Sequence, residues 1–254
     1  MKRLICGLVI VAAMLALVSC GSGEKVRILF IGNSLTYMND LPAVFAALAK
    51  HHKNVIYDSY APGGYRLSQH AADPQLLEKI KKGGWDFVVL QEQSQVPAFS
   101  QEQVGRESYP YAAALCELIR KDSPNAQIAF YMTMARRDGD AENAKFFPEV
   151  ATYAGMQSRI NETYTEMARQ NQGIVVPVGR VWQEMRSRRP EINIYFDEAH
   201  PNLTGTYLAA CVFYATLFKA SPVGLSHPEE IDNDTAAFIQ KITEEICAVG
   251  KTPQ

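Results

Sequence analysis

Short apolar runs alternate with longer segments of helical periodicity along most of the chain. The clearest run, Trp85 to Leu90, predicts a buried strand. Weaker runs predict further strands at residues 26–31, 54–60, 127–133 and 173–178. Apolar residues at helical spacing predict helices at residues 41–51, 75–82, 109–121, 149–169, 181–188, 203–217 and 234–249. Because strands separated by helices require parallel crossovers, this order predicts one α/β domain with a five-stranded parallel sheet covered on both faces.

The first residues have the pattern of an export signal. Lys2 and Arg3 precede an apolar run, residues 4–18, that ends in small residues and Cys20. This run is shorter than the roughly 20 residues needed to cross a membrane, so we expect a signal peptide over residues 1–19. Because its exit resembles the bacterial lipobox, we expect Cys20 to carry a lipid, residues 20–25 to form a tether and residues 26–250 to form the domain. The alternative is a plain signal peptide with a chance cysteine.

These features predict an exported protein that a lipid anchor holds in the bacterial cell envelope, facing the periplasm or at the outer membrane. The net charge of −2 and the pI of about 6.2 give no basic footprint, so nucleic acid is excluded as a partner. Cys116, Cys211 and Cys247 lie in apolar helical settings that favour buried thiols over disulfides. No cysteine has the spacing of a metal site, and we expect no metal and no cofactor.

A serine stands where the first strand ends. The apolar run that follows Arg27 stops at Gly32-Asn33-Ser34, which puts the Ser34 hydroxyl at the carboxyl end of a strand. Open α/β sheets bind their ligands at such ends. A serine hydroxyl is a poor nucleophile alone and needs a base that a third group orients. Without these partners, a serine at this place is more often a helix cap.

The segment Asp197-Glu198-Ala199-His200-Pro201 offers the base and its partner. A carboxylate three residues before a histidine can fold back onto the imidazole, so we expect Asp197 to orient His200 and regard Glu198 as the weaker candidate. Asp-Glu-Ala-His also occurs as a nucleotide-hydrolysis motif, but no phosphate loop follows an early strand here. The absence of a Gly-x-Ser-x-Gly pentapeptide excludes an α/β-hydrolase elbow.

Together these blocks resemble the SGNH (GDSL-like) hydrolase superfamily. Gly32-Asn33-Ser34-Leu35 matches the family's serine block, and Asp197 to Pro201 matches its final block. The resemblance implies a flavodoxin-like three-layer α/β/α fold with Ser34 as nucleophile, His200 as base and Asp197 as the residue that orients the base. It also implies an oxyanion hole with the backbone N–H groups of Ser34 and Gly64, because Gly64 lies where the family has its second, glycine block.

The family's third block, Gly-x-Asn-Asp, is missing. After the third strand the chain has Gln91-Glu92-Gln93-Ser94-Gln95, which indicates a divergent branch of the family. If Asp86 is aligned with the acidic residue that often opens this strand in the family, Gln95 takes the position of the family's asparagine, whose amide completes the oxyanion hole. Gln93 and Gln91 are the alternative candidates for this role. Loss of one oxyanion donor typically costs about 10² to 10³ in turnover, so this segment bears directly on activity.

The resemblance implies a lipid-anchored serine esterase that removes short acyl groups, acetyl above all, from a small molecule or a glycan. One alternative is a catalytically weak or inactive glycan-binding lipoprotein on the same fold, motivated by the missing block. A lipase or thioesterase with a long apolar pocket is another. Aromatic and charged residues near the expected loops, such as Tyr37 and Arg136, favour a polar substrate, whereas Arg66 and His70 are expected at solvated helix positions.

Overall fold

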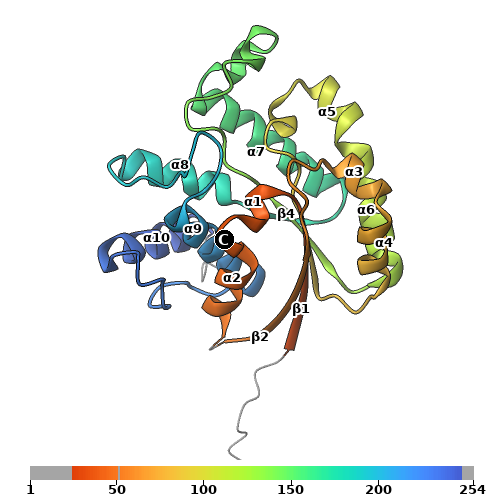
Figure 1. Ribbon diagram of the computed structural model, residues 1–254, viewed down its shortest axis with the longest axis horizontal. Helices are drawn as coiled ribbons and strands as arrows, with labels where there is room; N and C mark the ends of the chain where they lie inside the picture. The colour runs from red at the N-terminus through yellow and green to blue at the C-terminus, as the bar shows by residue number, and fades with distance from the viewer. Residues whose placement is uncertain (1–24, 51, 248–254) are drawn as a thin grey trace, which may run out of the picture.

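The computed structural model describes residues 25–50 and 52–247. All strands of its sheet are parallel and follow the order β2-β1-β3-β4-β5 (Figure 1). The strands are β1 (Lys25–Ile31), β2 (Asn54–Tyr60), β3 (Phe87–Leu90), β4 (Gln127–Tyr131) and β5 (Ile174–Val176). Helices cover both faces of the sheet, which confirms the prediction of a three-layer, flavodoxin-like domain with five parallel strands.

The helices form one layer on each face of the sheet (Figure 1). One layer consists of α2 (Leu41–Ala49), α8 (Val178–Arg188), α9 (Leu203–Phe218) and α10 (Asn233–Ile246). The other consists of α3 (Leu67–Ala72), α4 (Pro74–Lys81), α6 (Tyr109–Asp122) and α7 (Tyr153–Gln170), with α5 (Gln101–Glu107) beside α6. The short helix α1 (Ser34–Tyr37) follows β1 directly. Short 3₁₀ turns lie at residues 38–40, 96–98, 143–145 and 148–151.

Strand β1 contributes to the hydrophobic cores on both faces of the sheet. Successive side chains of a strand point to opposite faces. Accordingly, Ile28 and Phe30 enter the core under α2 and α9, whereas Leu29 and Ile31 enter the core under α6 and α7. Phe30 also meets Phe213 edge to face, with 5.8 Å between the ring centroids. All these side chains are fully buried, so an uninterrupted apolar strand is what this position requires.

Element boundaries differ from the expected ones where caps and proline intervene. The long helix begins at Tyr153 instead of residue 149, because the Thr152 hydroxyl accepts the N–H of Gly155 at 3.2 Å and caps the helix there. The last strand ends at Val176 instead of residue 178, because Pro177 has no N–H for the ladder. Helices α1, α3 and α5 are too short to show an apolar repeat in the sequence.

The three cysteines of the described chain are unpaired. Cys116 and Cys211 are buried, as expected, and burial raises the pKa of each thiol to about 12. Cys247 is only partly buried. Buried, protonated thiols of this kind are inert, so they contribute to packing and not to chemistry.

The residues on which the export prediction depends lie outside the described part of the chain. These are the expected signal peptide, residues 1–19, and the lipidated Cys20. Residues 248–250, at the expected end of the domain, lie outside it as well. Among the helices of the described residues, none is both long and apolar enough to cross a membrane.

The strand order brings two distant parts of the sequence to one place. Strand β1 has β2 on one side and β3 on the other, so the carboxyl ends of β1 and β3 form the topological switch point of the sheet. Open α/β sheets bind ligands at this point. Ser34 follows β1, and the glutamine-rich segment beginning at Gln91 follows β3. The fold therefore puts the serine block beside the divergent block.

His70 is buried, which corrects the expectation that it lies at a solvated helix position. On α3, its Nε2 donates to the carbonyl oxygen of Gly32 at 2.8 Å. The rings of Tyr60 and Tyr65 pack edge to face against the imidazole. Burial lowers the pKa of His70 and outweighs the Gly32 hydrogen bond and the Asp73 carboxylate, which act to raise it. A neutral His70 therefore supports the turn that follows β1.

This buried imidazole predicts a pH-dependent stability. The unfolded pKa is about 6.5 and the folded pKa is lower, so the unfolded chain binds the proton first. The contribution of His70 is complete above about pH 6.5 and is lost as the pH falls towards the folded pKa. We expect His70→Gln, which keeps a donor for Gly32, to flatten the decrease in unfolding free energy between about pH 7.5 and 5 in urea titrations.

His227→Gln is the matched control, because this histidine is only partly buried and lies near the start of α10. It should keep the slope of the parent protein. A His70→Gln variant that also keeps the full slope would contradict the assignment.

Candidate active site

Ser34 opens helix α1 with its hydroxyl free for chemistry. The cap of this helix is Asn33, whose side-chain oxygen accepts the N–H of Leu35 at 3.2 Å. Ser34 is the first residue inside the helix, so its hydroxyl does not act as the cap. Instead, Oγ of Ser34 lies 2.9 Å from Nε2 of His200, although the two residues are 166 positions apart in the sequence.

Asp197 holds His200 from the other side of the imidazole ring. Nδ1 of His200 donates to Oδ2 of Asp197 at 2.8 Å. Oδ1 of the same carboxylate accepts the backbone N–H groups of Ala199 and His200, each at 2.7 Å. Burial acts to raise the pKa of Asp197, but the two N–H groups and the imidazole outweigh it and lower the pKa to about 2. The carboxylate is therefore ionised at neutral pH.

The three side chains form a continuous hydrogen-bonded series. Because Nδ1 of His200 donates to Asp197, the lone pair on Nε2 is free to accept the proton of the Ser34 hydroxyl. Glu198 is not part of the series: its backbone carbonyl accepts the N–H of Arg137 at 2.7 Å, and its side chain lines a neighbouring cavity. The arrangement is that of a nucleophile, a base and a group that orients the base.

Gln91 is a buried support for the turn that carries Ser34. Its Oε1 accepts the N–H of Asn33 at 2.8 Å and the hydroxyl of Thr36 at 2.9 Å. Its Nε2 donates to Oδ1 of Asn33 at 3.0 Å and to the carbonyl oxygen of the next residue at 2.5 Å. Both amide hydrogens are used and the side chain is fully buried. Gln91, one of the sequence-based alternatives, has no hydrogen left for an oxyanion.

Gln93 and Gln95 differ in how far their amides are already used. Oε1 of Gln93 accepts the N–H groups of Gln95 and Val96, at 2.8 and 3.3 Å, which holds the side chain in place. Nε2 of Gln93 makes one long contact, 3.3 Å, to Oε1 of Gln95. Nε2 of Gln95 instead donates to the Asp140 carboxylate at 2.7 Å, a stronger charge-assisted bond. Gln93 therefore has the less committed amide, although alignment along the strand favours Gln95.

Gly64 lies in a turn that the Ser34 segment contacts. Its φ of +70° is left-handed, which favours glycine, and no atom lies within 4 Å of a Cβ built there. Nδ2 of Asn33 donates to the carbonyl oxygen of Tyr65 at 2.9 Å and so ties this turn to the residue before Ser34. Arg66, which follows Tyr65, is solvated as expected, and its guanidinium pairs with the carboxylate of Glu107 on α5 at 3.0 Å.

Glu92 is a buried carboxyl that the sequence analysis does not single out. It accepts the N–H of Leu67 at 3.1 Å, the N–H of Gln93 at 2.7 Å and the hydroxyl of Ser108 at 2.8 Å. Burial raises the pKa of Glu92, although these donors act to lower it. The carboxyl joins the segments that follow β2 and β3. The sequence signal that could have found it is an acidic residue directly after a buried strand.

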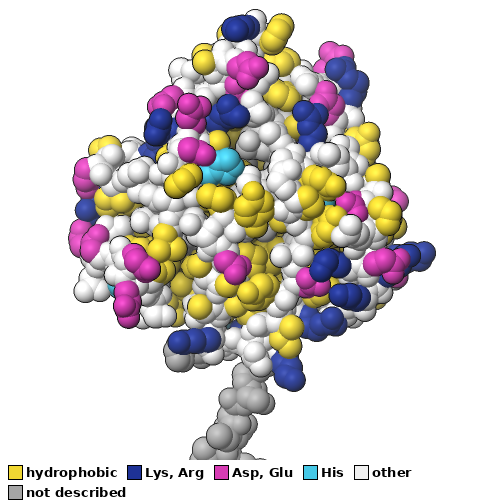
Figure 2. Space-filling view, viewed as in Figure 1, with side chains coloured by type: hydrophobic (Ala, Val, Ile, Leu, Met, Phe, Trp, Pro, Cys, Tyr) yellow, Lys and Arg dark blue, Asp and Glu magenta, His cyan; other side chains and the backbone are white. Residues whose placement is uncertain are grey.

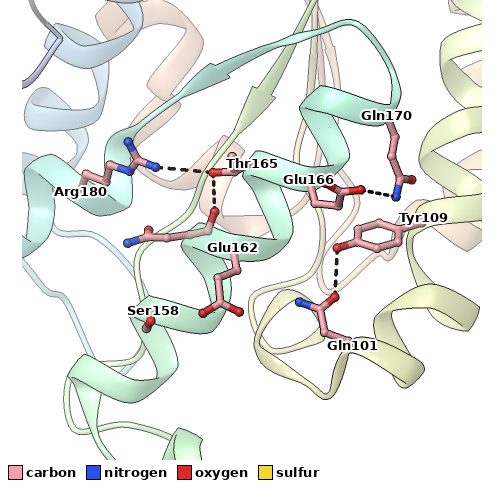
Figure 3. A pocket seen from close by; sticks show the side chains of 9 residues that line it. Gln101, Tyr109, Ser158, Glu162, Thr165, Glu166, Gln170 and Arg180 are labelled. Atoms are coloured by element: carbon pink, nitrogen blue, oxygen red, sulfur yellow. Dashed lines mark hydrogen bonds between the residues drawn. The ribbon is translucent and has the colours of Figure 1, made fainter.

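A wide hollow of about 700 Å³ lies elsewhere, along α7 beside α5 and α6 (Figure 3). Its lining is polar, but the charged groups already have partners. Glu166, for example, accepts hydrogen bonds from Arg169 and Gln170. None of the lining residues is a histidine. The hydrogen-bonded Ser34 and His200 at the edge of the sheet are therefore the better candidate for a reactive site.

Asn39 links the Ser34 helix to the His200 turn and is also missed by the sequence analysis. Its Nδ2 donates to the carbonyl oxygen of Pro201 at 3.1 Å and to Oγ1 of Thr206 at 3.0 Å. Its backbone is left-handed, with φ of 51°, and so is that of the next residue. Such a conformation costs about 1–3 kcal/mol outside glycine. The side-chain bonds hold this strained turn, and with it the separation of Ser34 and His200.

Replacement of Asn39 should disturb the Ser34–His200 pair more than it unfolds the protein. We expect Asn39→Ala to slow the labelling of Ser34 by a fluorophosphonate about 10- to 100-fold, because misplacement by about 1 Å costs up to about 10²-fold. Asn39→Gly removes the backbone strain together with the side chain, so it should be as slow while unfolding at a higher urea concentration than Asn39→Ala. Labelling of Asn39→Gly at the parent rate would rule out a positioning role.

Comparison with known proteins adds to this geometry. No family model and no curated protein matches the chain, whereas solved structures do. A DUF4886 family protein from Bacteroides uniformis has a TM-score of 0.74 at 16% identity, over 91% of this chain and 98% of that one. A "putative SGNH hydrolase" from Slackia heliotrinireducens has a TM-score of 0.62 at 27% identity, over 76% of this chain and 100% of that one. A catalytic mutant of an acetylxylan esterase from Geobacillus stearothermophilus has a TM-score of 0.53 at 15% identity, over 76% and 94%.

Two of these likenesses, at 15% and 16% identity, concern the fold alone. The match to the Slackia heliotrinireducens protein covers the whole of that chain at a higher identity. It agrees with the serine block after β1, with the Asp-x-x-His-Pro block before α9 and with the hydrogen bonds that join Asp197, His200 and Ser34. The chain belongs to the SGNH (GDSL-like) hydrolase superfamily.

Proposed function

We propose that the protein is a serine esterase that removes short acyl groups, acetyl above all, from carbohydrates. The observation that carries the proposal is the series of hydrogen bonds from Asp197 through His200 to Ser34, at 2.8 and 2.9 Å. A hydroxyl held against the free nitrogen of an oriented imidazole is activated as a nucleophile. A glycan-binding protein without turnover, the alternative suggested by the missing block, does not require a serine hydroxyl held against an oriented imidazole.

In the proposed reaction, Oγ of Ser34 attacks the ester carbonyl while Nε2 of His200 takes the hydroxyl proton. Asp197 stabilises the imidazolium that forms. The bond to the sugar oxygen then breaks as His200 returns the proton to that oxygen, which leaves the acyl group on Ser34. Water then attacks the acyl-enzyme while Nε2 of His200 takes one of its protons. The bond between the acyl group and Oγ of Ser34 breaks as His200 returns that proton to Oγ, which releases the carboxylic acid and restores the serine. The low pKa of Asp197 keeps its carboxylate charged throughout the pH range in which a histidine acts as base.

The proposed oxyanion hole consists of the backbone N–H groups of Ser34 and Gly64 and the side-chain amide of Gln93. Gln93 is preferred over Gln95 because its Nε2 makes only a long contact, whereas the other amide donates to Asp140 at 2.7 Å. Its position also fits: Gln93 follows Gln91 by two residues, the separation of glycine and asparagine in the family's Gly-x-Asn-Asp block. Donors fixed before the reaction stabilise the developing charge without reorganisation.

Acetylated carbohydrate is the substrate class that the surroundings support. One matched structure is that of an acetylxylan esterase. Beside the His200 turn lies a cavity whose lining includes Arg136, Glu142 and Glu198. A lipase or thioesterase needs a long apolar pocket instead, because an acyl chain cannot satisfy charged groups.

The proposal includes the place where the enzyme acts. A signal peptide over residues 1–19 and a lipid on Cys20 would hold the domain at the cell envelope, outside the cytoplasm. The basic start, the apolar run and the cysteine at its end support this location. Polymeric glycans at the envelope are accessible to an enzyme anchored there.

The nucleophile is tested with a fluorophosphonate probe and with methyl and aryl acetates. We expect the parent chain to be labelled and to hydrolyse the acetates. Ser34→Ala and His200→Ala should each lose turnover by at least about 10³-fold, because members of such a series act as a unit. Ser158→Ala, an exposed serine on α7, is the matched control and should keep parent activity. If the parent chain shows neither labelling nor turnover, the esterase proposal is wrong. If turnover survives in Ser34→Ala, Ser34 is not the nucleophile.

The oxyanion hole is tested by steady-state kinetics of the glutamine variants on the same acetates. Gln93→Ala should lower kcat by about 10² to 10³ with little change in KM, because the amide acts mainly on the charge that develops during the reaction. Gln95→Ala is the matched control and should lose less, since its amide already has a carboxylate partner. The assignment is overturned if Gln95→Ala loses more kcat than Gln93→Ala, or if Gln93→Ala retains the parent value.

A further inference from the structure

Two exposed aromatic rings flank the proposed nucleophile and its base. Tyr37 is 50% exposed and Phe196 is 71% exposed, whereas most aromatic residues of the described chain are buried or half-buried. In the view of Figure 2, hydrophobic side chains gather over α1, with charged side chains beyond them. A single exposed ring needs no explanation. Two rings beside reactive groups mark a surface for contact with a ligand.

The backbone positions of Tyr37 and Phe196 determine where their side chains leave the chain. Tyr37 follows Ser34 by three positions on α1, so their Cβ atoms lie about 5–6 Å apart on one face of the helix. Phe196 donates its N–H to the carbonyl oxygen of His200 at 2.8 Å, next to the bridge between residues 195 and 201. The bridge puts Phe196 directly opposite His200 in the turn, an arrangement in which the side chains of an antiparallel pair share one face. Since Ser34 and His200 are hydrogen-bonded, both rings border the place where an ester must bind.

The surface next to these rings fits a sugar better than an acyl chain. A cavity of about 360 Å³ adjoins the His200 turn, and its charged lining residues are Arg136, Asp138, Asp140, Glu142 and Glu198. A pyranose has C–H groups on its faces and hydroxyl groups around its edge, so it can stack on an aromatic ring and hydrogen-bond to charged groups at once. An alkyl chain would remove water from these charges and return no hydrogen bond.

We propose that Tyr37 and Phe196 form an aromatic clamp for the sugar ring that carries the ester. This inference rests on the proposed esterase function. It adds that the enzyme selects its substrate by the cyclic alcohol of the ester rather than by the acyl group. The sugar ring stacks against the two side chains with its ester directed at Ser34. The next sugars of a polymer extend towards the charged cavity beside Glu198. Neither aromatic ring takes part in the chemistry, so both determine specificity.

Hydrolysis of matched acetates by the full chain tests the clamp. Methyl acetate has no ring, whereas xylose tetraacetate and glucose pentaacetate carry their acetyl groups on a pyranose. Tyr37→Ala and Phe196→Ala should each lower kcat/KM for the sugar acetates about tenfold, chiefly through KM. Their kcat/KM for methyl acetate should stay within about twofold of the parent value, because neither ring contacts that substrate.

Three further variants serve as controls. Tyr37→Phe and Phe196→Tyr keep an aromatic ring at each position and should retain the parent preference for the sugar acetates. Tyr111→Ala removes an exposed tyrosine from α6, which covers the opposite face of the sheet from α2 and α9. This variant should behave as the parent.

The outcomes distinguish the clamp from the esterase proposal. If the parent hydrolyses none of the acetates, the esterase proposal fails. If the parent is active and the alanine variants keep its kcat/KM on every acetate, the clamp alone is overturned. Equal losses on methyl acetate and on the sugar acetates would assign the rings to the support of Ser34 and His200, which also overturns the clamp. The clamp is also overturned if the alanine variants lose more kcat/KM on methyl octanoate than on methyl acetate, since the rings would then bind the acyl chain.

Discussion

The buried carboxamide of Gln91 is the contact on which the geometry of the candidate active site depends. Its oxygen accepts the N–H of Asn33 and the hydroxyl of Thr36, and so holds both sides of the turn that presents Ser34. A buried polar group left without a partner costs about 1–3 kcal/mol, and here every hydrogen-bonding position of the amide is used. Gly32 completes the fit, because a Cβ there would lie 2.3 Å from the Thr36 hydroxyl and 2.4 Å from the Gln91 oxygen.

The glutamine-rich segment after β3 divides its tasks among successive residues. Gln91 supports the serine turn, Glu92 binds the start of α3 and the hydroxyl of Ser108, and Gln93 keeps an amide that is only weakly engaged. The glycine that opens the family's block has no side chain with which to support the serine turn. Longer side chains are accommodated here because the first two point into the protein, where they are fully buried, and the third lies at the partly exposed rim.

Local patterns in the sequence were enough to predict the layers of the fold and the candidate residues Ser34, Asp197 and His200. A strand is recognised from its own apolar residues, and the Asp-x-x-His turn closes within three positions. The roles of His70, Gln91 and Asn39 were not predictable in this way. Their hydrogen bonds reach residues 38, 58 and 162 positions away. A histidine on a short helix looks solvated until the strand end against which it packs is known.

The turn at Asp197 explains how His200, the proposed base, is oriented at the surface of the protein. The side chains of Asp197 and His200 are 45% and 32% exposed, so burial protects neither. The carboxylate is instead held by two N–H groups of its own turn, which also account for much of its low pKa. Because these bonds are local, the orientation of the imidazole needs neither a lid nor a deep pocket. The same local hydrogen bonds therefore orient an imidazole that is exposed to solvent and keep Asp197 ionised, which leaves room for the bulky polymer ester of the proposed function.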